Sequence, residues 1–273
     1  MIRADLHNHS TVSDGSNSME DIVQLAVDHG LDAIAITDHD TVSHLSKLPV
    51  RSDIKVIGGV EISAYEKHKG YRVHILAYNI KKPEVLAEAV RPTLEARHKN
   101  CLKQIHILEK NGYKFDLDDM RKADGRYIYK QHIMEYLVRT GQVKDKLFGE
   151  FYRKTFKNHG ICDFDINYPD PFHMVSAVVE AGGLPVLAHS GQQQNFQLIP
   201  ELEKCGLRGL EYNHPANSEK DKEIIRKYAN VYELFLTGGS DSHGDFEKNS
   251  ASVGDYLAEE SGIHAIFGQE EPS

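Results

Sequence analysis

The stretch Asp5-Leu6-His7-Asn8-His9-Ser10, followed by Asp14, lies at the beginning of this 273-residue chain. It overlaps the short run Ile2 to Leu6, which indicates a first β-strand. Because side chains alternate along a strand, His7 and His9 are expected on the same face. Two neutral imidazoles placed in this way can bind one metal ion, and Asp14 could add a carboxylate. A single His-x-His pattern is more often incidental, so this stretch alone does not establish a metal site.

The same arrangement recurs along the chain. Strand-like apolar runs repeatedly end in residues that commonly bind metals. After the first run, these residues are Asp38-His39-Asp40, Glu61, His74, His189 and Asp241-Ser242-His243. Chance rarely produces such a recurrence, which favours a metal site built from many strand ends.

Length and composition indicate an ordinary globular chain. With 273 residues, 40% of them hydrophobic, it suits one barrel-sized domain or one domain with an insertion. It has no run of about 18 apolar residues, and Arg3 and Asp5 do not suit a signal peptide, so we expect a cytoplasmic protein without a membrane segment. Cys101, Cys162 and Cys205 are widely spaced, which suggests neither a disulfide framework nor a cysteine zinc site.

The formal net charge of −9 argues against a large basic surface for duplex DNA or RNA. It does not exclude a phosphate-bearing substrate. Divalent cations held by the acidic residues would reverse the local charge and attract an anion.

The first two strands and the helix between them predict parallel strands covered by helices. Ser18 and Asp21 indicate a capped helix that ends at Gly30, between the first strand and a second one at Leu31 to Thr37. A short helix, Thr41 to Leu48, and two strands, Ile54 to Ser63 and Tyr71 to Tyr78, are expected to follow.

Residues 82–165 are polar and predict helices. The expected helices are Pro92 to Gly112, Gln131 to Arg139 and Gln142 to His159. We therefore predict a barrel made of residues 1–81 and 166–273, with residues 82–165 as a helical insertion over its mouth. The alternative is that these are surface helices of one continuous domain.

The alternation of helices and strands resumes at Pro171. The predicted order is a helix through Val179, a strand Leu184 to Ala188, a helix Phe196 to Cys205, a strand Leu207 to Tyr212, a helix Ser218 to Ala229 and a strand Leu234 to Gly238. With the four strands before the insertion, the count is seven.

Several motifs resemble those of the PHP (polymerase and histidinol phosphatase) superfamily, and most closely its stand-alone bacterial phosphoesterases with a helical insertion. The motifs are Asp5 to His9, Thr37-Asp38-His39, Gly59-Val60-Glu61, His74, Ala188-His189 and Gly239-Ser240-Asp241-Ser242-His243. The resemblance implies an α/β fold, a distorted (β/α)7 TIM-like barrel, with two or three divalent ions at its C-terminal mouth.

The resemblance also implies a ligand set. One ion would be held by His7, His9, Glu61 and Asp241, and a second by Glu61, His74 and His189, whereas a third would be held by Asp14, His39 and His243. Glu61, Asp241 and His243 are the expected catalytic residues. Imidazole and carboxylate ligands suit Mn, Zn or Fe.

Asp5 and Asp38 flank ligating histidines. We expect them to accept hydrogen bonds that fix the imidazole tautomers, although plain buried hydrogen bonds are an equal alternative. His214, in a loop after the sixth strand, is left out of the ligand set.

Two departures from the family pattern affect the substrate site. Ser190-Gly191 follows His189 where the family usually has proline, which leaves the shape of that loop open. Lys130-Gln131-His132-Ile133 replaces an Arg-Pro-His-Ile-type sequence. Lys130 and His132 are therefore candidates for substrate binding, and Arg97 and Arg126 are alternatives. Lysine can receive a phosphate only as a point charge, without the fork of arginine.

The leading hypothesis is a metal-dependent phosphoesterase that uses a metal-bound hydroxide. The resemblance favours a nucleotide or the end of a short RNA, as in a nucleoside 3′,5′-bisphosphate phosphatase or a 5′-3′ exonuclease. A histidinol-phosphate-type phosphatase is the alternative. A non-catalytic metal-binding or regulatory module is less consistent with nine intact ligand positions. No Walker A, nucleophile-elbow or dinucleotide motif supports another chemistry, and no protein partner is inferred.

Overall fold

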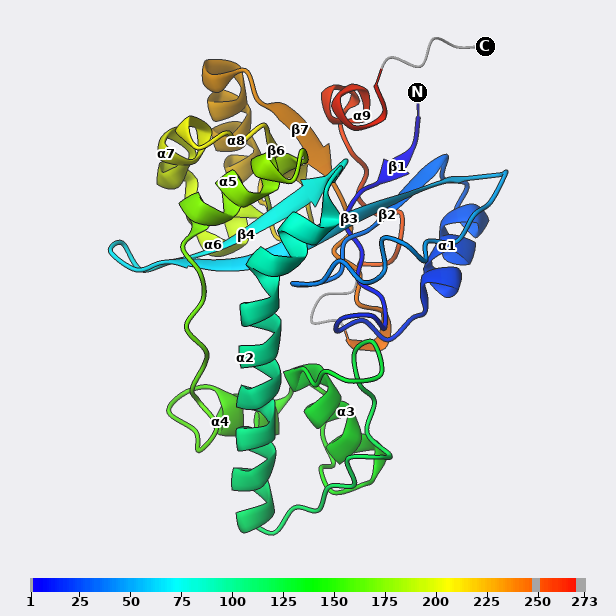
Figure 1. Cartoon of the computed structure of the whole chain (residues 1–273). Helices are drawn as coiled ribbons and strands as arrows, with labels where there is room; N and C mark the ends of the chain where they lie inside the picture. Colours follow the sequence, from blue (N-terminus) through cyan, green and yellow to red (C-terminus); the bar gives the residue numbers. More distant parts are fainter. Residues whose placement is uncertain (1, 247–250, 269–273) are drawn as a thin grey trace.

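The structure, a computed structural model, describes residues 2–246 and 251–268. Within these residues seven strands form one sheet, in the order β1 to β7 (Figure 1). The strands are β1 (Ala4–Asp5), β2 (Ala33–Ile36), β3 (Lys55–Glu66), β4 (Tyr71–Tyr78), β5 (Leu184–Leu187), β6 (Gly209–Asn213) and β7 (Phe235–Gly238).

Backbone hydrogen bonds between the two edges nearly close this sheet into a barrel. Leu6 N donates to Gly238 O over 3.1 Å, and Asp241 N donates to His7 O over 2.8 Å. Asn8 and Ser242 form an isolated parallel bridge just beyond. The predicted TIM-like barrel is confirmed, and its closure brings the segments after β1 and β7 together.

One strand runs against the others. The pairs β1–β2, β2–β3, β5–β6 and β6–β7 are parallel, whereas β4 is antiparallel to both β3 and β5. Residues 67–70 are too few for a parallel crossover, so β3 and β4 form a hairpin. His74 therefore lies inside β4, opposite Ser63, and not at the end of a strand as the sequence suggested.

The longer helices cover the barrel and build the segment between β4 and β5. They are α1 (Met19–Asp28), α2 (Pro83–Lys110), α3 (Lys130–Arg139), α4 (Glu150–Phe156), α5 (Pro171–Glu180), α7 (Ile199–Lys204), α8 (Glu219–Tyr232) and α9 (Glu260–Phe267). Short turns of helix occur at α6 (Ser190–Gln193), η1 (Phe196–Leu198) and η2 (Gly244–Phe246). The predicted cap of α1 is present, because Asp21 N donates to Ser18 Oγ over 3.1 Å.

Three helix predictions need correction. Residues 41–48 form turns, and His44 Nε2 lies 2.7 Å from Gly59 O, which holds this segment against the barrel rim. The long helix begins at Pro83 and not at Pro92, because Pro83 occupies the first turn of a helix, where proline is favoured. Pro92 lies inside the helix. Within 142–159 only α4 is helical. The Asp145 side chain accepts a hydrogen bond from Phe151 N near the start of α4, after a turn at 146–149.

The segment between β4 and β5 has a hydrophobic cluster of its own. It includes Cys101, Leu108, Ile133, Leu137 and Phe156. The largest cluster of the barrel lies among β3, β4, α5 and α8, and it also takes in Leu86 and Val90 from the start of α2. Figure 1 shows α2 extending away from the barrel, with α3 and α4 beside its far half. This arrangement supports the proposal that residues 82–165 are a helical insertion.

None of the helices formed by residues 2–246 and 251–268 has both the length and the apolar character needed to cross a membrane.

Candidate metal centre

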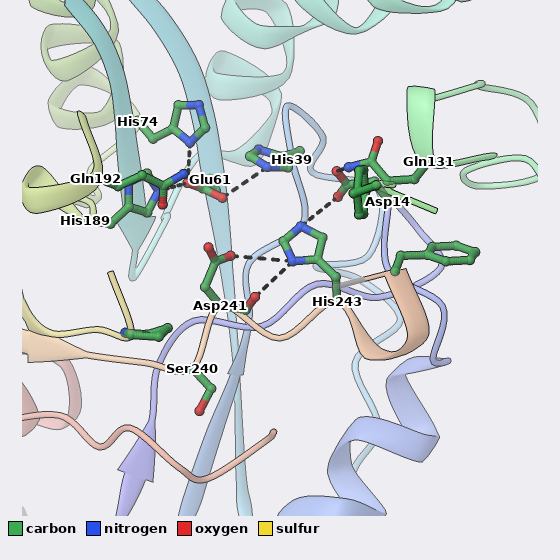
Figure 2. Close-up of a pocket in the computed structure, with 13 residues that line it drawn as sticks. Asp14, His39, Glu61, His74, Gln131, His189, Gln192, Ser240, Asp241 and His243 are labelled. Carbon is green, nitrogen blue, oxygen red and sulfur yellow. Dashed lines mark hydrogen bonds and ion pairs between the residues drawn. The ribbon is translucent and has the colours of Figure 1, made fainter. Parts of the chain in front are cut away.

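Glu61, in the middle of β3, lies at the centre of the predicted ligands (Figure 2). Its Oε2 is 3.1 Å from His7 Nε2, 3.0 Å from His9 Nε2 and 3.2 Å from His39 Nε2. Its Oε1 is 2.7 Å from His74 Nδ1 and 2.8 Å from His189 Nε2. One carboxylate therefore faces two groups of imidazoles, which is the arrangement expected of a bridging ligand.

The remaining predicted ligands complete the cluster. Asp241 Oδ1 lies 3.1 Å from His9 Nε2, and Asp14 Oδ1 lies 3.5 Å from His243 Nε2. Among the described residues, three groups made only of predicted ligands lie close enough to share an ion: His7, His9, Glu61 and Asp241; His9, Asp14, His39 and His243; and His39, Glu61 and His74. A fourth group contains His7 with Glu211 and His214. These groups resemble the predicted sets, with two differences. His9 and His39 each belong to two groups, and His189 belongs to none of them, although its Nε2 lies 2.8 Å from Glu61 Oε1.

The donor atoms fit divalent cations. His7 Nε2 and His9 Nε2 lie 3.2 Å apart, and Asp241 Oδ1 is buried without a hydrogen-bond partner among the described residues. Ligands bound at roughly 2.0–2.2 Å from one ion are spaced in this way. The residues present thus suit metal ions.

Backbone geometry positions two of these side chains. His189 has φ 25° and Asp241 has φ 51°, values that non-glycine residues rarely adopt. Gly239, two residues before Asp241, passes so close to His7 that a Cβ there would lie 2.4 Å from His7 N. The chain after β7 can approach β1 only because residue 239 is glycine.

The cluster is buried, and its charges balance one another. Burial would raise the pKa of Glu61, but His39, His7 and His74 hold this pKa well below its usual value. The pKa of His39 falls to about 4 because of burial. For His9, burial is outweighed by Asp241 and Glu61, which raise the pKa to about 10. Cations would replace protons at such a site, so metal binding should depend on pH.

Asp5 and Asp38 do not contact the ligand rings as expected. Asp5 accepts hydrogen bonds from Ser240 Oγ at 2.6 Å and from Gly254 N at 2.7 Å, and Asp38 accepts from Ser10 and Ser13 hydroxyls. Both carboxylates hold the loops that carry the ligands. The plain buried hydrogen bond, which was the alternative, describes them.

Three residues of the site were missed by the sequence analysis. Glu211 contacts a predicted ligand, and Gln131 and Gln192 line the cavity beside the cluster. His214, which was considered and left out of the ligand set, contacts Asp241. Glu211 could have been noticed, because it interrupts the apolar run of β6 as Glu61 interrupts that of β3. Gln131 offered no signal of this kind.

A family model for the PHP domain matches residues 5–159, which is more than half of the chain. The chain belongs to the PHP domain family. Among its relatives, phosphoribosyl 1,2-cyclic phosphate 1,2-diphosphodiesterase of Eggerthella lenta is 41% identical over 89% of this chain and 94% of that protein. A 5′-3′ exoribonuclease of Haemophilus influenzae is 27% identical over 88% of this chain and 89% of that protein.

A solved structure supports the same family. A metal-dependent phosphoesterase from Bifidobacterium adolescentis superimposes with a TM-score of 0.86 at 25% identity, covering 97% of this chain and 95% of that one. This PHP protein is therefore an enzyme, a metal-dependent phosphoesterase, as predicted. The alternative of a non-catalytic module is not supported.

Two adjoining cavities open beside the cluster of the PHP protein. The cluster cavity has a volume of about 140 Å³ and is lined by Asp14, His39, Glu61, His74, Gln131, Phe148, His189, Gln192, Pro215, Ser240, Asp241, His243 and Phe246. The basic cavity, of about 160 Å³, is lined by Arg72, Arg97, Lys130 and Lys157 together with Ser63, Ala64, Tyr152, Asp165 and Tyr168. The two cavities share walls at Asp14, His39, His74, Gln131 and Phe148.

The four predicted substrate residues separate into two pairs. Lys130 and Arg97 line the basic cavity, and Arg97 Nη2 donates to Asp40 Oδ2 over 2.6 Å and to Ser63 Oγ over 2.9 Å. Arg126 is exposed, with its guanidinium 4.6 Å from the centre of the Tyr127 ring, and lines neither cavity. His132 also lines neither; it is buried, and its Nδ1 accepts a hydrogen bond from Tyr129 N.

Proposed function

We propose that this chain hydrolyses a small phosphorylated sugar that carries two phosphate groups, such as a phosphoribosyl cyclic phosphate. The reacting phosphate would lie at the cluster cavity and the second phosphate in the basic cavity. The observation that carries the proposal is the wall shared by these two cavities, one lined by metal-type ligands and the other by four cationic side chains. The 41% identical relative, whose name gives such a substrate, supports it.

The cation pattern supports an anchoring role for the basic cavity. Lys130 Nζ lies 3.6 Å from Asp165 Oδ2, and Arg72 Nη2 lies 3.4 Å from the same oxygen. Arg97 is held by Asp40 and Ser63, so it contributes a fixed positive charge. The Asp165 carboxylate thus faces the cationic groups of Lys130 and Arg72 at long distances. A dianionic phosphate bound beside them could neutralise the remaining positive charge.

We propose that the nine predicted ligands hold two or three divalent ions. Eight of them fall into the candidate ion groups, and His189 contacts Glu61 of these groups. The mixed imidazole and carboxylate donors suit Mn, Zn or Fe. When bound, such ions supply an activated water and offset negative charge on a phosphoryl group. Among the chain's own residues, Glu61 would bridge, because its two oxygens face different imidazoles. Asp241 Oδ1 lies 3.4 Å from His7 Nε2 and 3.1 Å from His9 Nε2, so these three residues and Glu61 would hold one ion together.

A second candidate is a nucleotide or the end of a short RNA. A wider cavity of about 770 Å³ begins at His74 and Gln192 and continues past Tyr65, Arg72 and Tyr168. Its volume exceeds what a sugar phosphate needs. Tyrosine rings and cations along its wall are the groups that commonly bind single-stranded nucleic acid. The exoribonuclease relative supports this candidate.

One assay separates the candidates. Hydrolysis would be measured with the metal-reconstituted protein by chromatography of the products, because opening a cyclic phosphodiester or cleaving an RNA end leaves the phosphate on an organic product. The substrates are phosphoribosyl 1,2-cyclic phosphate, a nucleoside 3′,5′-bisphosphate, a 5′-phosphorylated oligoribonucleotide and histidinol phosphate. We expect the highest kcat/KM for the phosphoribosyl compound, and a loss of about tenfold or more when its second phosphate is absent. Equal kcat/KM with and without the second phosphate would contradict the anchoring role. A preference for the oligoribonucleotide would favour the second candidate.

A further inference from the structure

Strand β6 carries none of the nine predicted ligands, yet Glu211 from this strand reaches into the cluster. The side chain of Glu211 is buried. Its Oε1 lies 2.9 Å from His7 Nδ1, and its Oε2 accepts a hydrogen bond from His189 N over 2.8 Å. Both carboxylate oxygens are therefore used, and each holds a residue that also contacts Glu61.

The contact with His7 decides which nitrogen of that ring is available. When His7 Nδ1 carries the proton and donates to Glu211, His7 Nε2 presents a lone pair towards Glu61 and Asp241. A metal-bound histidine commonly donates its other N–H to a carboxylate in this way, which fixes the ring and makes it a better ligand.

The contact with His189 holds an unusual backbone. His189 has φ 25° and ψ 54°, outside the regions that most residues prefer. Such a conformation persists only where its surroundings stabilise it. The hydrogen bond from His189 N to Glu211 provides this stabilisation and keeps His189 Nε2 2.8 Å from Glu61.

A fourth ion between His7, Glu211 and His214 is the competing explanation, since their donor atoms lie close together. The hydrogen bonds of His214 argue against it. His214 Nδ1 accepts from Ala216 N over 3.0 Å, so Nε2 of the neutral ring carries the proton. That Nε2 lies 3.3 Å from Asp241 Oδ2 and donates to it. His214 thus has no lone pair to offer an ion beside Glu211.

We propose that Glu211 is a positioning residue, which orients His7 and His189 so that both rings present Nε2 to the ions. His214 positions Asp241 in a similar way. Its Nε2 donates to Asp241 Oδ2, which leaves Asp241 Oδ1 facing His9. Glu211 of β6 and His214 just after it therefore orient ligands on the segments that follow β1, β5 and β7, without binding an ion themselves.

The test is Glu211→Gln, which conserves shape but leaves one acceptor oxygen for two donors. We expect the dissociation constants of the bound ions to rise about 10- to 100-fold, as measured by competition with a chelating dye. Hydrolysis should recover partly as the metal concentration is raised. A purely structural defect would not respond to metal.

Glu66→Gln is the matched control. Glu66 is also buried and also accepts from two N–H groups, those of His68 and Lys69, but at the far end of β3. The Glu66→Gln substitution should lower the thermal stability of the metal-free protein and leave the metal dissociation constants unchanged.

Three outcomes would overturn the proposal. The first is that Glu211→Gln keeps wild-type metal dissociation constants. The second is that Glu66→Gln raises these constants as much as Glu211→Gln does. The third is that Glu211→Gln loses one whole ion at saturating metal, which would make Glu211 a ligand. If Glu211→Gln does not fold, His214→Asn tests the same relationship through Asp241, and it should also raise a metal dissociation constant. An unchanged constant there would contradict the proposed role of β6. These measurements use metal alone, so their outcome is independent of the proposed substrate.

Discussion

Gln131 Nε2 donates a hydrogen bond of 2.6 Å to Asp14 Oδ2, which joins the first turn of α3 to the loop after β1. Tyr129, two residues before Gln131, makes a similar connection, since its hydroxyl donates to His39 O over 2.9 Å. Asp14 and His39 belong to the same candidate ion group. The helical segment therefore holds two of the four residues of this group by hydrogen bonds, Asp14 and His39, whereas His9 and His243 complete it.

Replacing Gln131 should weaken that group selectively. Gln131→Leu removes the donor to Asp14 and keeps a similar volume, so we expect the weakest-bound ion to dissociate about tenfold more readily. Titration of the metal-free protein with Mn would measure this change. Gln24→Leu is the control, because Gln24 also donates to a carboxylate, that of Asp28, but on the exposed surface of α1. A response as large in Gln24→Leu would contradict the specific role of Gln131.

Asp14→Ala tests whether the site holds three ions or two. Asp14 comes from a loop, whereas Glu61 and its nearest imidazoles are held by strands or strand ends. We predict the loss of about one ion per chain and a large fall in activity, with little loss of folding. Elemental analysis after gel filtration measures the ion content. A full complement with normal turnover would show that Asp14 is only a turn residue before Gly15.

Lys130→Ala tests the basic cavity. If Lys130 binds the non-reacting phosphate equally in the ground and transition states, KM should rise, by about tenfold, while kcat changes little. Steady-state phosphate release gives both constants. Lys154→Ala is a suitable control, since Lys154 is 74% exposed and pairs with Glu150 on α4. Unchanged constants for Lys130→Ala would remove it from the substrate site.

Acid should destabilise the protein partly through His132. Burial lowers the pKa of His132 to about 4 in the folded state, from an ordinary value of 6.5. The unfolded chain therefore binds more protons between pH 6.5 and pH 4, and the free energy of unfolding falls as pH drops through this window. Between pH 7 and pH 4.5, the free energy of unfolding of metal-free His132→Asn should fall by roughly 2 kcal/mol less than that of the metal-free wild type. Urea unfolding at both pH values measures the difference, and an equal loss in both proteins would contradict it.

Much of the site was predictable because its ligands end or interrupt apolar runs. His7, His9, Glu61 and His189 all follow this rule, which depends only on local patterning. The direction of β4 was harder to predict, because it depends on the short turn at 67–70. His74 reaches the cluster from inside a strand for this reason.

Contacts between distant segments account for what sequence reasoning missed. The bond between Gln131 and Asp14 spans 117 positions, and that between His7 and Glu211 spans 204. No local pattern marks such pairs. Arg126 illustrates the opposite case. Its charge made it a candidate for substrate binding, but it is exposed and lines neither cavity.

The bridging role of Glu61 is tested by the hydrolysis rate of metal-loaded Glu61→Gln. An amide in place of the carboxylate keeps the shape of Glu61 but not the negative charge that faces five imidazoles, so it cannot bridge two cations. We predict a folded protein whose rate of hydrolysis falls by at least about a thousandfold, as expected when a shared ligand of two ions is lost. Hydrolysis close to the wild-type rate, with the ions still bound, would contradict it.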